Sequence, residues 1–366
     1  MVHFLGAIQM EQKSKYFLLI SMFTEKRAFV VLQLVLLLFS VKLYSQSTLF
    51  NSNVPFTIEL VADYNEIFND RNPENAKYHN AILVFQDSIS NYRSINVKLK
   101  TRGIFRRSRE NCKVPPLTVK FELDTIKGKS VFEGYNKLKL VNVCQIRDKY
   151  EQLLIKEYYV YRIYNIITDY SFRVRLVRVL YIDREGNYSN FSRYGFLIED
   201  FKSLALRNNT CVVKTKGITQ FGLDRNLELK MAFFQYMIGN TDWSVSKLHN
   251  IKLLYSEKKT NTIAVPYDFD FCGFVNPPYT KPPDIIPITN VRERYYRGAC
   301  REDFEFTNTA KFFLQKKDEI YSLFRSDTLL TARNKSNIME YLDAFFEIMS
   351  SESSLKREII RKCREN

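Results

Sequence analysis

The period of the apolar residues changes along the chain, and this change constrains the fold more than any other feature of the sequence. In the first part, apolar residues recur at every second position, which is the spacing of a strand with one buried face. Several segments show this strand character: 56–64, 81–87, 95–103, 116–123, 136–143, 173–183 and 194–200. Between them, residues 148–168 carry apolar residues at helical spacing. We therefore expect residues 48–200 to form an antiparallel sheet with one long helix inserted.

The second part of the chain has a different pattern. Residues 227–238 form a strongly apolar helical segment that ends at Gly239-Asn240, a common stop signal. Two short buried strands, an ordered loop and a helical end follow, at 251–255, 262–269, 276–300 and 304–366. A β-rich half before a helix-rich half predicts an α+β fold with a cleft between two lobes. The expected lobes are a β-rich N-lobe (48–200) and a mainly helical C-lobe (201–366).

The N-terminal segment has the organisation of a secretory signal peptide. Lys26 and Arg27 form a short positive region, and the apolar run 28–41 follows. We expect a signal peptide over residues 1–45, with a start that is open between Met1 and Met22, and export to the periplasm or the extracellular space. The alternative is an uncleaved membrane anchor through residues 28–41.

The charge of the chain restricts its partners. The formal net charge is +15; the first 45 residues contribute +3, so the remainder carries +12. A basic body suits phosphate-bearing ligands or an anionic envelope surface, although solubility alone is an equal explanation. No nucleic-acid-binding module is recognisable, so we expect no specific nucleic acid. The six cysteines form no CxxC pair, which argues against a zinc ribbon. Cys272 with Cys300 is a candidate disulfide in an exported chain, and buried free thiols are the equal alternative for most of the cysteines.

Four polar residues stand at the ends of apolar segments in the region 239–273. Asp242 follows the helix 227–238, Asn250 precedes one strand, and Asp268 and Asp270 follow the next strand. If these two strands form a hairpin, Asn250 and Asp268 lie at the same end of it. Carboxylate and amide oxygens are ligands for Mg²⁺ or Mn²⁺, and a separate aspartate is suited to accept a proton from an acceptor hydroxyl. The alternative is a group of turn residues that are acidic by chance.

These motifs resemble the catalytic loop and metal-binding segment of atypical kinases, especially the spore-coat protein H (CotH) kinase-like family. The similar segments are His249–Leu254 (HNIKLL) and Pro266–Asp270 (PYDFD), with KTRGIFRRS and PPLTVKF upstream. The resemblance covers most of residues 95–275 and implies a two-lobed protein-kinase-like fold that uses ATP. The chain departs from kinases in two respects. Asp242 and Asn250 are eight residues apart, against five in the pattern H-R-D-x-x-x-x-N, and no Gly-rich loop is present.

The resemblance also implies roles for individual residues. Asp242 is the expected catalytic base, and Asn250, Asp268 and Asp270 are the expected metal ligands. The nucleotide would contact Lys120 or its rival Lys139, Arg102 in place of the Gly-rich loop, a helix glutamate (Glu157 or Glu151), and the strand that ends at Glu199. We expect His249 to orient a neighbour through a hydrogen bond. The arginines of the 291–302 run, Arg292, Arg294 and Arg297, either bind an anionic acceptor or stabilise an ordered loop, and we favour the loop.

The sequence therefore predicts an exported phosphotransferase that uses a Mg²⁺– or Mn²⁺–ATP complex to modify a protein, sugar or lipid acceptor. Two alternatives remain open at this point. The first is an inactive pseudokinase or binding module of the cell envelope. The second is a metal-dependent hydrolase with Asp268 and Asp270 as ligands. Transfer of the nucleotide instead of the phosphoryl group is also open.

Overall fold

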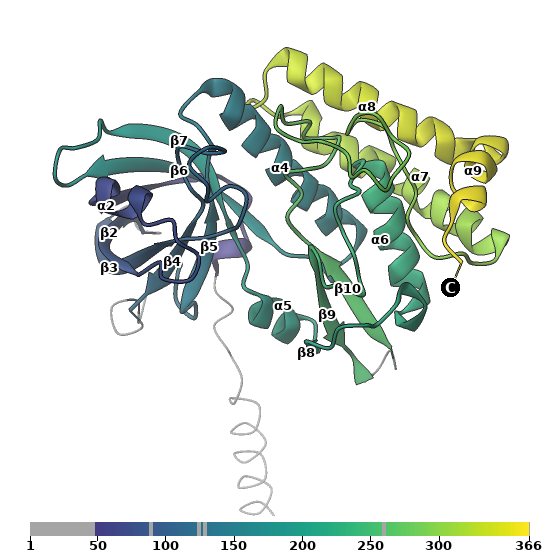
Figure 1. Ribbon diagram of the computed structural model, residues 1–366, viewed down its shortest axis with the longest axis horizontal. Helices are drawn as coiled ribbons and strands as arrows, with labels where there is room; N and C mark the ends of the chain where they lie inside the picture. Colours follow the sequence, from purple (N-terminus) through teal and green to yellow (C-terminus); the bar gives the residue numbers. More distant parts are fainter. Residues whose placement is uncertain (1–47, 88–90, 123–125, 127–129, 258–260, 366) are drawn as a thin grey trace, which may run out of the picture. The chain divides into compact units, whose positions relative to one another are not determined.

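A computed structural model describes residues 48–87, 91–122, 126, 130–257 and 261–365 (Figure 1). Residues 47–366 form one compact unit. The predicted signal peptide over residues 1–45, with its alternative of an anchor through 28–41, lies outside the described residues. Among the described helices, none has the length and apolar character that a membrane crossing requires.

The main sheet of the protein is a closed barrel. Its strands follow one another in the order β1-β2-β3-β4-β5-β7-β6. Their bounds are β1 (Phe56–Ala62), β2 (His79–Gln86), β3 (Tyr92–Thr101), β4 (Leu117–Phe121), β5 (Lys137–Val141), β6 (Val174–Asp183) and β7 (Phe191–Ile198). Each predicted strand of this region is confirmed, and its alternate apolar side chains fill the barrel interior, as in the burial pattern of β4.

The barrel closes where β1 meets β6, and this pairing is parallel. Phe56 lies opposite Val177 and Ala62 lies opposite Asp183, whereas the other neighbouring strands pair in antiparallel fashion. The long helix α4 (Asp148–Ile167) connects β5 to β6, which confirms the predicted helix 148–168. Short elements in the described part of this region include η1 (Thr48–Phe50), α2 (Tyr64–Asn69) and α5 (Phe201–Arg207).

A second, smaller sheet lies among the remaining helices. Its strands are β8 (Cys211–Val213), β9 (Ile251–Tyr255) and β10 (Thr262–Pro266), in the order β10-β9-β8. The predicted hairpin of 251–255 with the following strand is confirmed, because Pro266 pairs with Ile251 and Thr262 with Tyr255. The helices are α6 (Arg225–Met237), α7 (Asp303–Arg325), α8 (Ala332–Ser350) and α9 (Glu352–Glu358), with the short turns η2 (Gln220–Gly222) and η4 (Ile360–Lys362).

The predicted two-lobed protein-kinase-like fold with a helical C-lobe is wrong. The main sheet is a closed seven-stranded barrel, and the C-terminal half contains a three-stranded sheet beside its helices. One continuous apolar core joins residues of both predicted lobes, for example Leu176 and Phe196 from the barrel strands with Phe234 and Phe345 from the helices. Apolar periodicity predicts that a strand has one buried face, but it contains no information on whether the sheet closes. For this reason the sequence predicted the strands and not the barrel.

The disulfide bonds differ from the predicted pair. Cys112 is bonded to Cys144, and Cys300 is bonded to Cys363. Cys272 is a buried free thiol, so the candidate Cys272–Cys300 bond is wrong and the alternative, a buried free thiol, is confirmed for Cys272. Cys300 instead follows a parallel bridge between Ala299 and Arg364, which brings the C-terminal residues beside it.

Candidate functional site

The loop after α6 carries the candidate base, and buried polar contacts fix its shape. Gly239 adopts a left-handed backbone (φ 62°) that a residue with a Cβ reaches only with strain. The next residue, Asn240, is buried; its Nδ2 donates to Gln235 Oε1 (2.9 Å), and its Oδ1 accepts from the backbone N–H of Asp242 (3.0 Å). Trp243 is also buried, and its indole donates to the carbonyl of Asn240 (3.2 Å). The loop therefore holds Asp242 in one position.

Asp242, His249 and Asn250 form one hydrogen-bonded group. Nε2 of His249 lies 2.7 Å from Asp242 Oδ1, which agrees with the orienting contact that we predicted. Nδ2 of Asn250 donates to the Asp242 carbonyl (2.8 Å) and to Asp242 Oδ2 (3.0 Å). Both N–H bonds of the amide thus point to Asp242, so its Oδ1 points elsewhere as an acceptor. The eight-residue spacing of Asp242 and Asn250 is therefore compatible with direct contact between them.

Asp268 follows β10 in an unusual backbone conformation. Its φ is 65° and that of Asn250 is 52°, which is the left-handed region that residues with a Cβ rarely occupy. The backbone N–H of Tyr267 donates to the Asn250 carbonyl (3.0 Å), and the N–H of Asp268 donates to the hydroxyl of Tyr161 on α4 (2.9 Å). These bonds place Asn250 and Asp268 at one end of the β9–β10 hairpin, with the Asp268 side chain exposed.

Two buried carboxylates, Glu157 on α4 and Asp270, share one guanidinium. Nη1 of Arg106 lies 3.9 Å from Glu157 and 4.0 Å from Asp270. Burial raises the pKa of Asp270 to about 7, with a further increase from the charge of Asp268, and Arg106 opposes this rise. Burial and the charge of Asp270 raise the pKa of Glu157 well above its usual range. At neutral pH the Glu157–Asp270 pair therefore carries less than two full negative charges.

A small cavity adjoins these carboxylates. Its volume is about 10 Å³, which is enough for one water molecule, and Arg106, Glu157, Asp270 and Tyr279 line it. Within the described part of the chain, Nε of Arg106 is buried without a hydrogen-bond partner. The cavity is thus a polar extension of the site, with an N–H donor available to a small ligand.

The positive charges of Lys139 and Arg102 both interact with the negative charge of Asp268. Burial lowers the pKa of Lys139 to about 8, the positive charge of Arg102 lowers it further, and Asp268 partly offsets this change. Burial lowers the pKa of Arg102, and attraction to Asp268 opposes the effect. The ammonium of Lys139 stands 5.1 Å from the centre of the Tyr267 ring, and that of Lys252 stands 5.5 Å from the same ring. Lys139 nevertheless keeps exposed surface, so a ligand can reach it.

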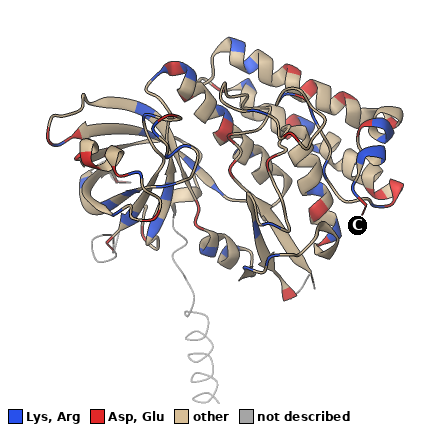
Figure 2. Cartoon of the chain, viewed as in Figure 1, with Lys and Arg blue, Asp and Glu red and all other residues tan. Residues whose placement is uncertain are grey.

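The structure favours Lys139 over Lys120 as the lysine of the site. Basic residues recur on the barrel strands (Figure 2), and the register places Lys120 between Lys98 and Lys137. The ammonium of Lys120 stands 5.3 Å from the ring centre of Tyr78, whereas that of Lys139 stands 5.1 Å from the ring centre of Tyr267, the residue before Asp268. Lys139 lies opposite Thr118, which is two residues nearer than Lys120 to the start of β4 and therefore nearer to Arg102.

Of the two candidate helix glutamates, Glu157 belongs to the site and Glu151 does not. Glu151 Oε1 accepts from the backbone N–H of Tyr194 (2.6 Å) and pairs with Arg178 (3.3 Å) on the barrel. Glu199, at the end of the strand that is predicted to contact the nucleotide, is buried and paired with Arg207 (2.9 Å). Its carboxylate is therefore engaged within the protein, which leaves only the backbone of its strand for a nucleotide.

The loop 102–116 that carries Arg102 and Arg106 is held at both ends. Arg102 N–H donates to Pro116 O (2.9 Å), and the Cys112–Cys144 disulfide joins the loop to the segment after β5. Arg106 Nη2 donates to the Asn142 carbonyl in that same segment. In addition, the Phe105 ring contacts the Phe271 and Tyr279 rings at centroid distances of 5.1 and 5.4 Å. These contacts fix both arginines beside Asp268 and Asp270.

The arginines of the 291–302 run support the loop interpretation. Arg294 donates to the Met237 carbonyl (3.1 Å) at the end of α6, and its guanidinium lies 3.8 Å from the centre of the Tyr341 ring. Arg297 donates to the backbone carbonyls of Thr241 and Trp243, on both sides of Asp242. Arg294 and Arg297 therefore stabilise the backbone of the candidate site.

The oxygen atoms of the site fit a hard divalent cation, but they are not gathered into a finished metal centre. Among the described residues, no group of three or more His, Cys, Asp or Glu side chains could hold a metal ion. The exposed Asp268 carboxylate and the acceptor end of the Asn250 amide are the oxygens best placed for one. Mg²⁺ typically uses one or two protein carboxylates and takes its remaining ligands from phosphates and water. The residues therefore fit a cation that arrives with a phosphate ligand.

No protein-family model matches this chain, and no curated protein matches it. The chemistry of the site consequently rests on its own residues. The sequence placed Arg106, with Arg107 and Arg109, in a cluster beside Arg102 that would cover phosphates, but it did not predict the contact of Arg106 with Glu157 and Asp270. Sequence reasoning did not find the contribution of Tyr161, which stood in an apolar helical pattern where burial was the simple expectation.

Proposed function

We propose that this site binds the phosphate groups of a nucleotide, with a divalent cation, and transfers a phosphoryl group to an acceptor hydroxyl. One observation carries the proposal: the exposed Asp268, in a left-handed conformation at the hairpin end, interacts with the cations Arg102 and Lys139 and adjoins the amide of Asn250. A site that alternates acidic oxygens with cationic donors suits a metal-bound polyphosphate. The proposal rests on these side chains and not on a kinase-like fold.

Asp268 and Asn250 would hold Mg²⁺ or Mn²⁺, and Asp270 lies behind them. When bound, the metal–ATP complex supplies the transferable phosphoryl group and neutralises part of its charge. Arg102 and Lys139 bind phosphate oxygens, for which Arg102 offers a planar fork of donors and Lys139 a point charge. With its pKa near 8, Lys139 is mostly protonated at pH 7.

Asp242 would orient the acceptor hydroxyl and accept its proton. Its side chain is 38% exposed, so an acceptor can reach it, while His249 and Asn250 fix its carboxylate through hydrogen bonds. Nothing in this arrangement distinguishes a protein hydroxyl from that of a sugar or lipid. With the predicted export, we propose an acceptor in the cell envelope.

A thermal-shift measurement with a matched pair of lysine variants tests the binding step. Mg²⁺–ATP at 100 times its Kd stabilises a folded protein by about 2.7 kcal/mol. We expect this shift in the wild type and in Lys120→Met, which loses a lysine of the same sheet face. We expect it to be absent or strongly reduced in Lys139→Met and Asp268→Asn. Equal shifts in the two lysine variants would contradict the assignment.

Label transfer from γ-labelled ATP to protein or envelope fractions tests the chemical step. We expect transfer by the wild type and none by Asp242→Ala, although that variant still binds ATP. If Mg²⁺–ATP binds without any transfer, the protein is instead the inactive binding module. If no nucleotide stabilises the protein, phosphoryl transfer is wrong, and metal-dependent hydrolysis is the next reaction to assay.

A further inference from the structure

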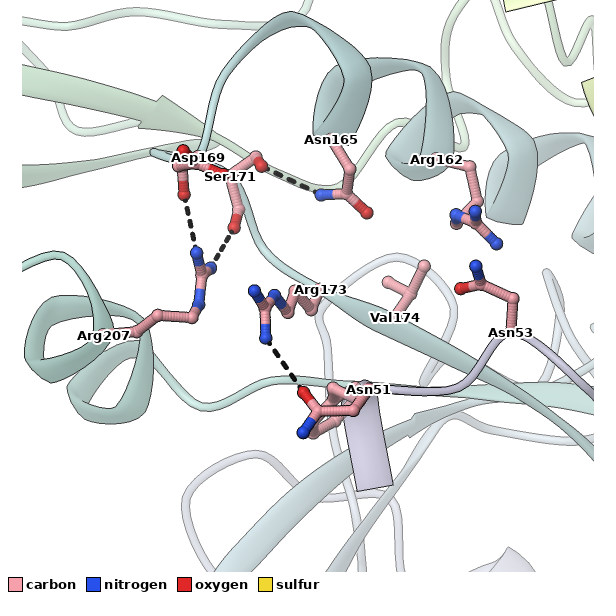
Figure 3. A pocket seen from close by; sticks show the side chains of 10 residues that line it. Asn51, Asn53, Arg162, Asn165, Asp169, Ser171, Arg173, Val174 and Arg207 are labelled. Atoms are coloured by element: carbon pink, nitrogen blue, oxygen red, sulfur yellow. Dashed lines mark hydrogen bonds between the residues drawn. The ribbon is translucent and has the colours of Figure 1, made fainter. Parts of the chain in front are cut away.

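A second and larger cavity lies apart from the residues of the candidate site. Its volume is about 420 Å³, within the range of small-molecule sites, and it lies where the C-terminal end of α4 meets the start of β6, α5 and the segment after η1 (Figure 3). The polar side chains on which the argument depends are Asn51, Asn53, Arg162, Asn165, Arg173 and Arg207. Neither Asp268 nor Lys139 contributes to it.

The charges of this cavity do not cancel. Arg207 is neutralised by Glu199, because its Nε and Nη2 contact the two oxygens of that carboxylate at 3.1 and 2.9 Å. Asp169 adds one carboxylate to the lining, and Arg162 and Arg173 add two guanidinium groups. No described carboxylate forms an ion pair with Arg162 or Arg173. Three arginines and Asp169 give the lining a charge of +2, and Glu199, which pairs with Arg207 from outside the lining, lowers the local net charge to +1.

Neutral groups hold these two arginines. Arg173 Nη1 donates to Asn51 Oδ1 (3.2 Å), and Arg162 Nη1 donates to the hydroxyl of Tyr158 (3.0 Å). Figure 3 shows Arg173 between Asn51 and Arg207, and shows Arg162 and Asn53 pointing toward each other. Each guanidinium has five N–H donors, so one hydrogen bond each leaves most of the donors of Arg162 and Arg173 without a protein acceptor among the described residues. A bound oxyanion would accept from these donors and offset the positive charge of the lining.

The other polar groups indicate what is attached to the anion. Asn51 and Asn53 are exposed carboxamides, which offer a donor and an acceptor each, and Asn165 stands on α4 beside Arg162. Carboxamides of this kind recognise hydroxyl groups as well as oxyanions. The cavity also contains little apolar surface beyond Phe50 and Val174. An apolar or aromatic ligand is thus a poor match.

We propose that this cavity binds a small anionic sugar: a polyol of about monosaccharide size that carries one phosphate or carboxylate group. Arg162 and Arg173 bind the oxyanion, for which the planar guanidinium is well suited, and the asparagines bind hydroxyl groups. Phosphorylated and carboxylated sugars share this chemistry. The cavity shares no lining residue with Asp268, Asn250, Lys139 or Asp242, although Glu199, at the end of the strand predicted to contact the nucleotide, pairs with Arg207 of this cavity.

Titration calorimetry on the full chain tests the proposal with four probes: glucose 6-phosphate, glucuronate, inorganic phosphate and glucose. We expect one or both anionic sugars to bind, and Arg162→Gln/Arg173→Gln to weaken that binding at least about 100-fold, about 10-fold for each lost charge-assisted contact. Arg184→Gln is the matched control, because Arg184 is exposed and pairs with its neighbour Glu185 (2.9 Å). Asn53→Ala should weaken the sugars but not inorganic phosphate.

The remaining outcomes decide against the proposal in part or in full. If neither anionic sugar binds at millimolar concentration, or if both bind the double arginine variant as tightly as the wild type, the cavity is not an anion site. Glucose binding equal to that of the anionic sugars would contradict the role of the arginines. Inorganic phosphate binding equal to glucose 6-phosphate would contradict the role of the asparagines. A melting curve of each variant without ligand shows that it is folded.

Discussion

Replacement of Arg106 by methionine removes the guanidinium that Glu157 and Asp270 share. The two contacts measure 3.9 and 4.0 Å, and at an effective dielectric constant of 20 a pair at this distance gains about 4 kcal/mol before desolvation is subtracted. Loss of one member of a buried ion pair costs about 3–5 kcal/mol, because the remaining charge stays buried. We therefore expect Arg106→Met to lower the free energy of unfolding by about 3–5 kcal/mol where the carboxylates are ionised.

The pH dependence of this loss identifies its cause. The pKa of Asp270 rises from 3.8 to about 7 on folding, so between these values the folded protein holds a proton that the unfolded chain has released. The contribution of Asp270 titration to the free energy of unfolding therefore falls as the pH rises from 3.8 to about 7, and it is constant above that pH. Without Arg106 the pKa values of both carboxyl groups rise further. At pH 5 both are protonated in the folded variant, and the loss shrinks to about 1 kcal/mol, the value of the hydrogen bond to the Asn142 carbonyl.

Thermal unfolding at pH 5 and pH 8 measures both values. At roughly 2 °C per kcal/mol for a chain of this size, we expect Tm to fall by about 6–10 °C at pH 8 and by about 2 °C at pH 5. Arg109→Met, on an exposed residue of the same loop, is the control and should change Tm little at either pH. An equal loss at pH 5 and pH 8 would refute the electrostatic explanation and assign the loss to packing.

Other perturbations test other parts of the structure. Gly239→Ala should lower the free energy of unfolding by about 1–2 kcal/mol because of the left-handed backbone, and further because the new Cβ overlaps the Tyr341 hydroxyl. Adding Tyr341→Phe to this variant should recover the part that is due to the overlap, and urea unfolding measures both values. Replacement of both Cys300 and Cys363 by serine should cost about 2–4 kcal/mol, and a reductant should then change the Tm of the wild type more than that of the variant. The phosphate affinity attributed to Lys139 should fall as the pH rises through about 8, which nucleotide titration at pH 7 and pH 9 measures.

The local elements of this fold are predictable from the sequence, and their closure is not. Alternation along Leu117–Phe121 fixes which side chains are buried, because a strand with one buried face has a period of two. The parallel pairing of β1 with β6 joins residues more than one hundred positions apart, as with Phe56 and Val177. No residue type signals that contact. The pairing depends on the direction in which α4 returns the chain to the sheet, and apolar periodicity predicts the helix but not this direction.

The same distinction applies to the candidate site. Asn250 and Asp268 were predictable neighbours, because both stand at the ends of strands in one hairpin. The choice between Lys120 and Lys139 was not predictable, because both alternate outward on adjacent strands and differ only in their position along the barrel. That position depends on the register of β5 against β4. Register is determined by side chains across the whole sheet and not by any one segment.

The local backbone of the site can be explained by the bonds around it. Left-handed conformations at Asn250 and Asp268 cost free energy, of order 1–3 kcal/mol each, so the surrounding contacts must compensate for this cost. The Tyr267 N–H to Asn250 carbonyl bond extends the β9–β10 pairing by one step, and the Tyr161 hydroxyl accepts the next N–H. Phe269 then packs against Tyr161 and Phe234, at centroid distances of 4.7 and 5.4 Å. The left-handed φ of Asp268 interrupts the extended backbone, so the regular alternation of a strand does not continue here: Asp268 is exposed, whereas Phe269 and Asp270 are both buried. This local break explains why two acidic side chains only two positions apart have such different environments.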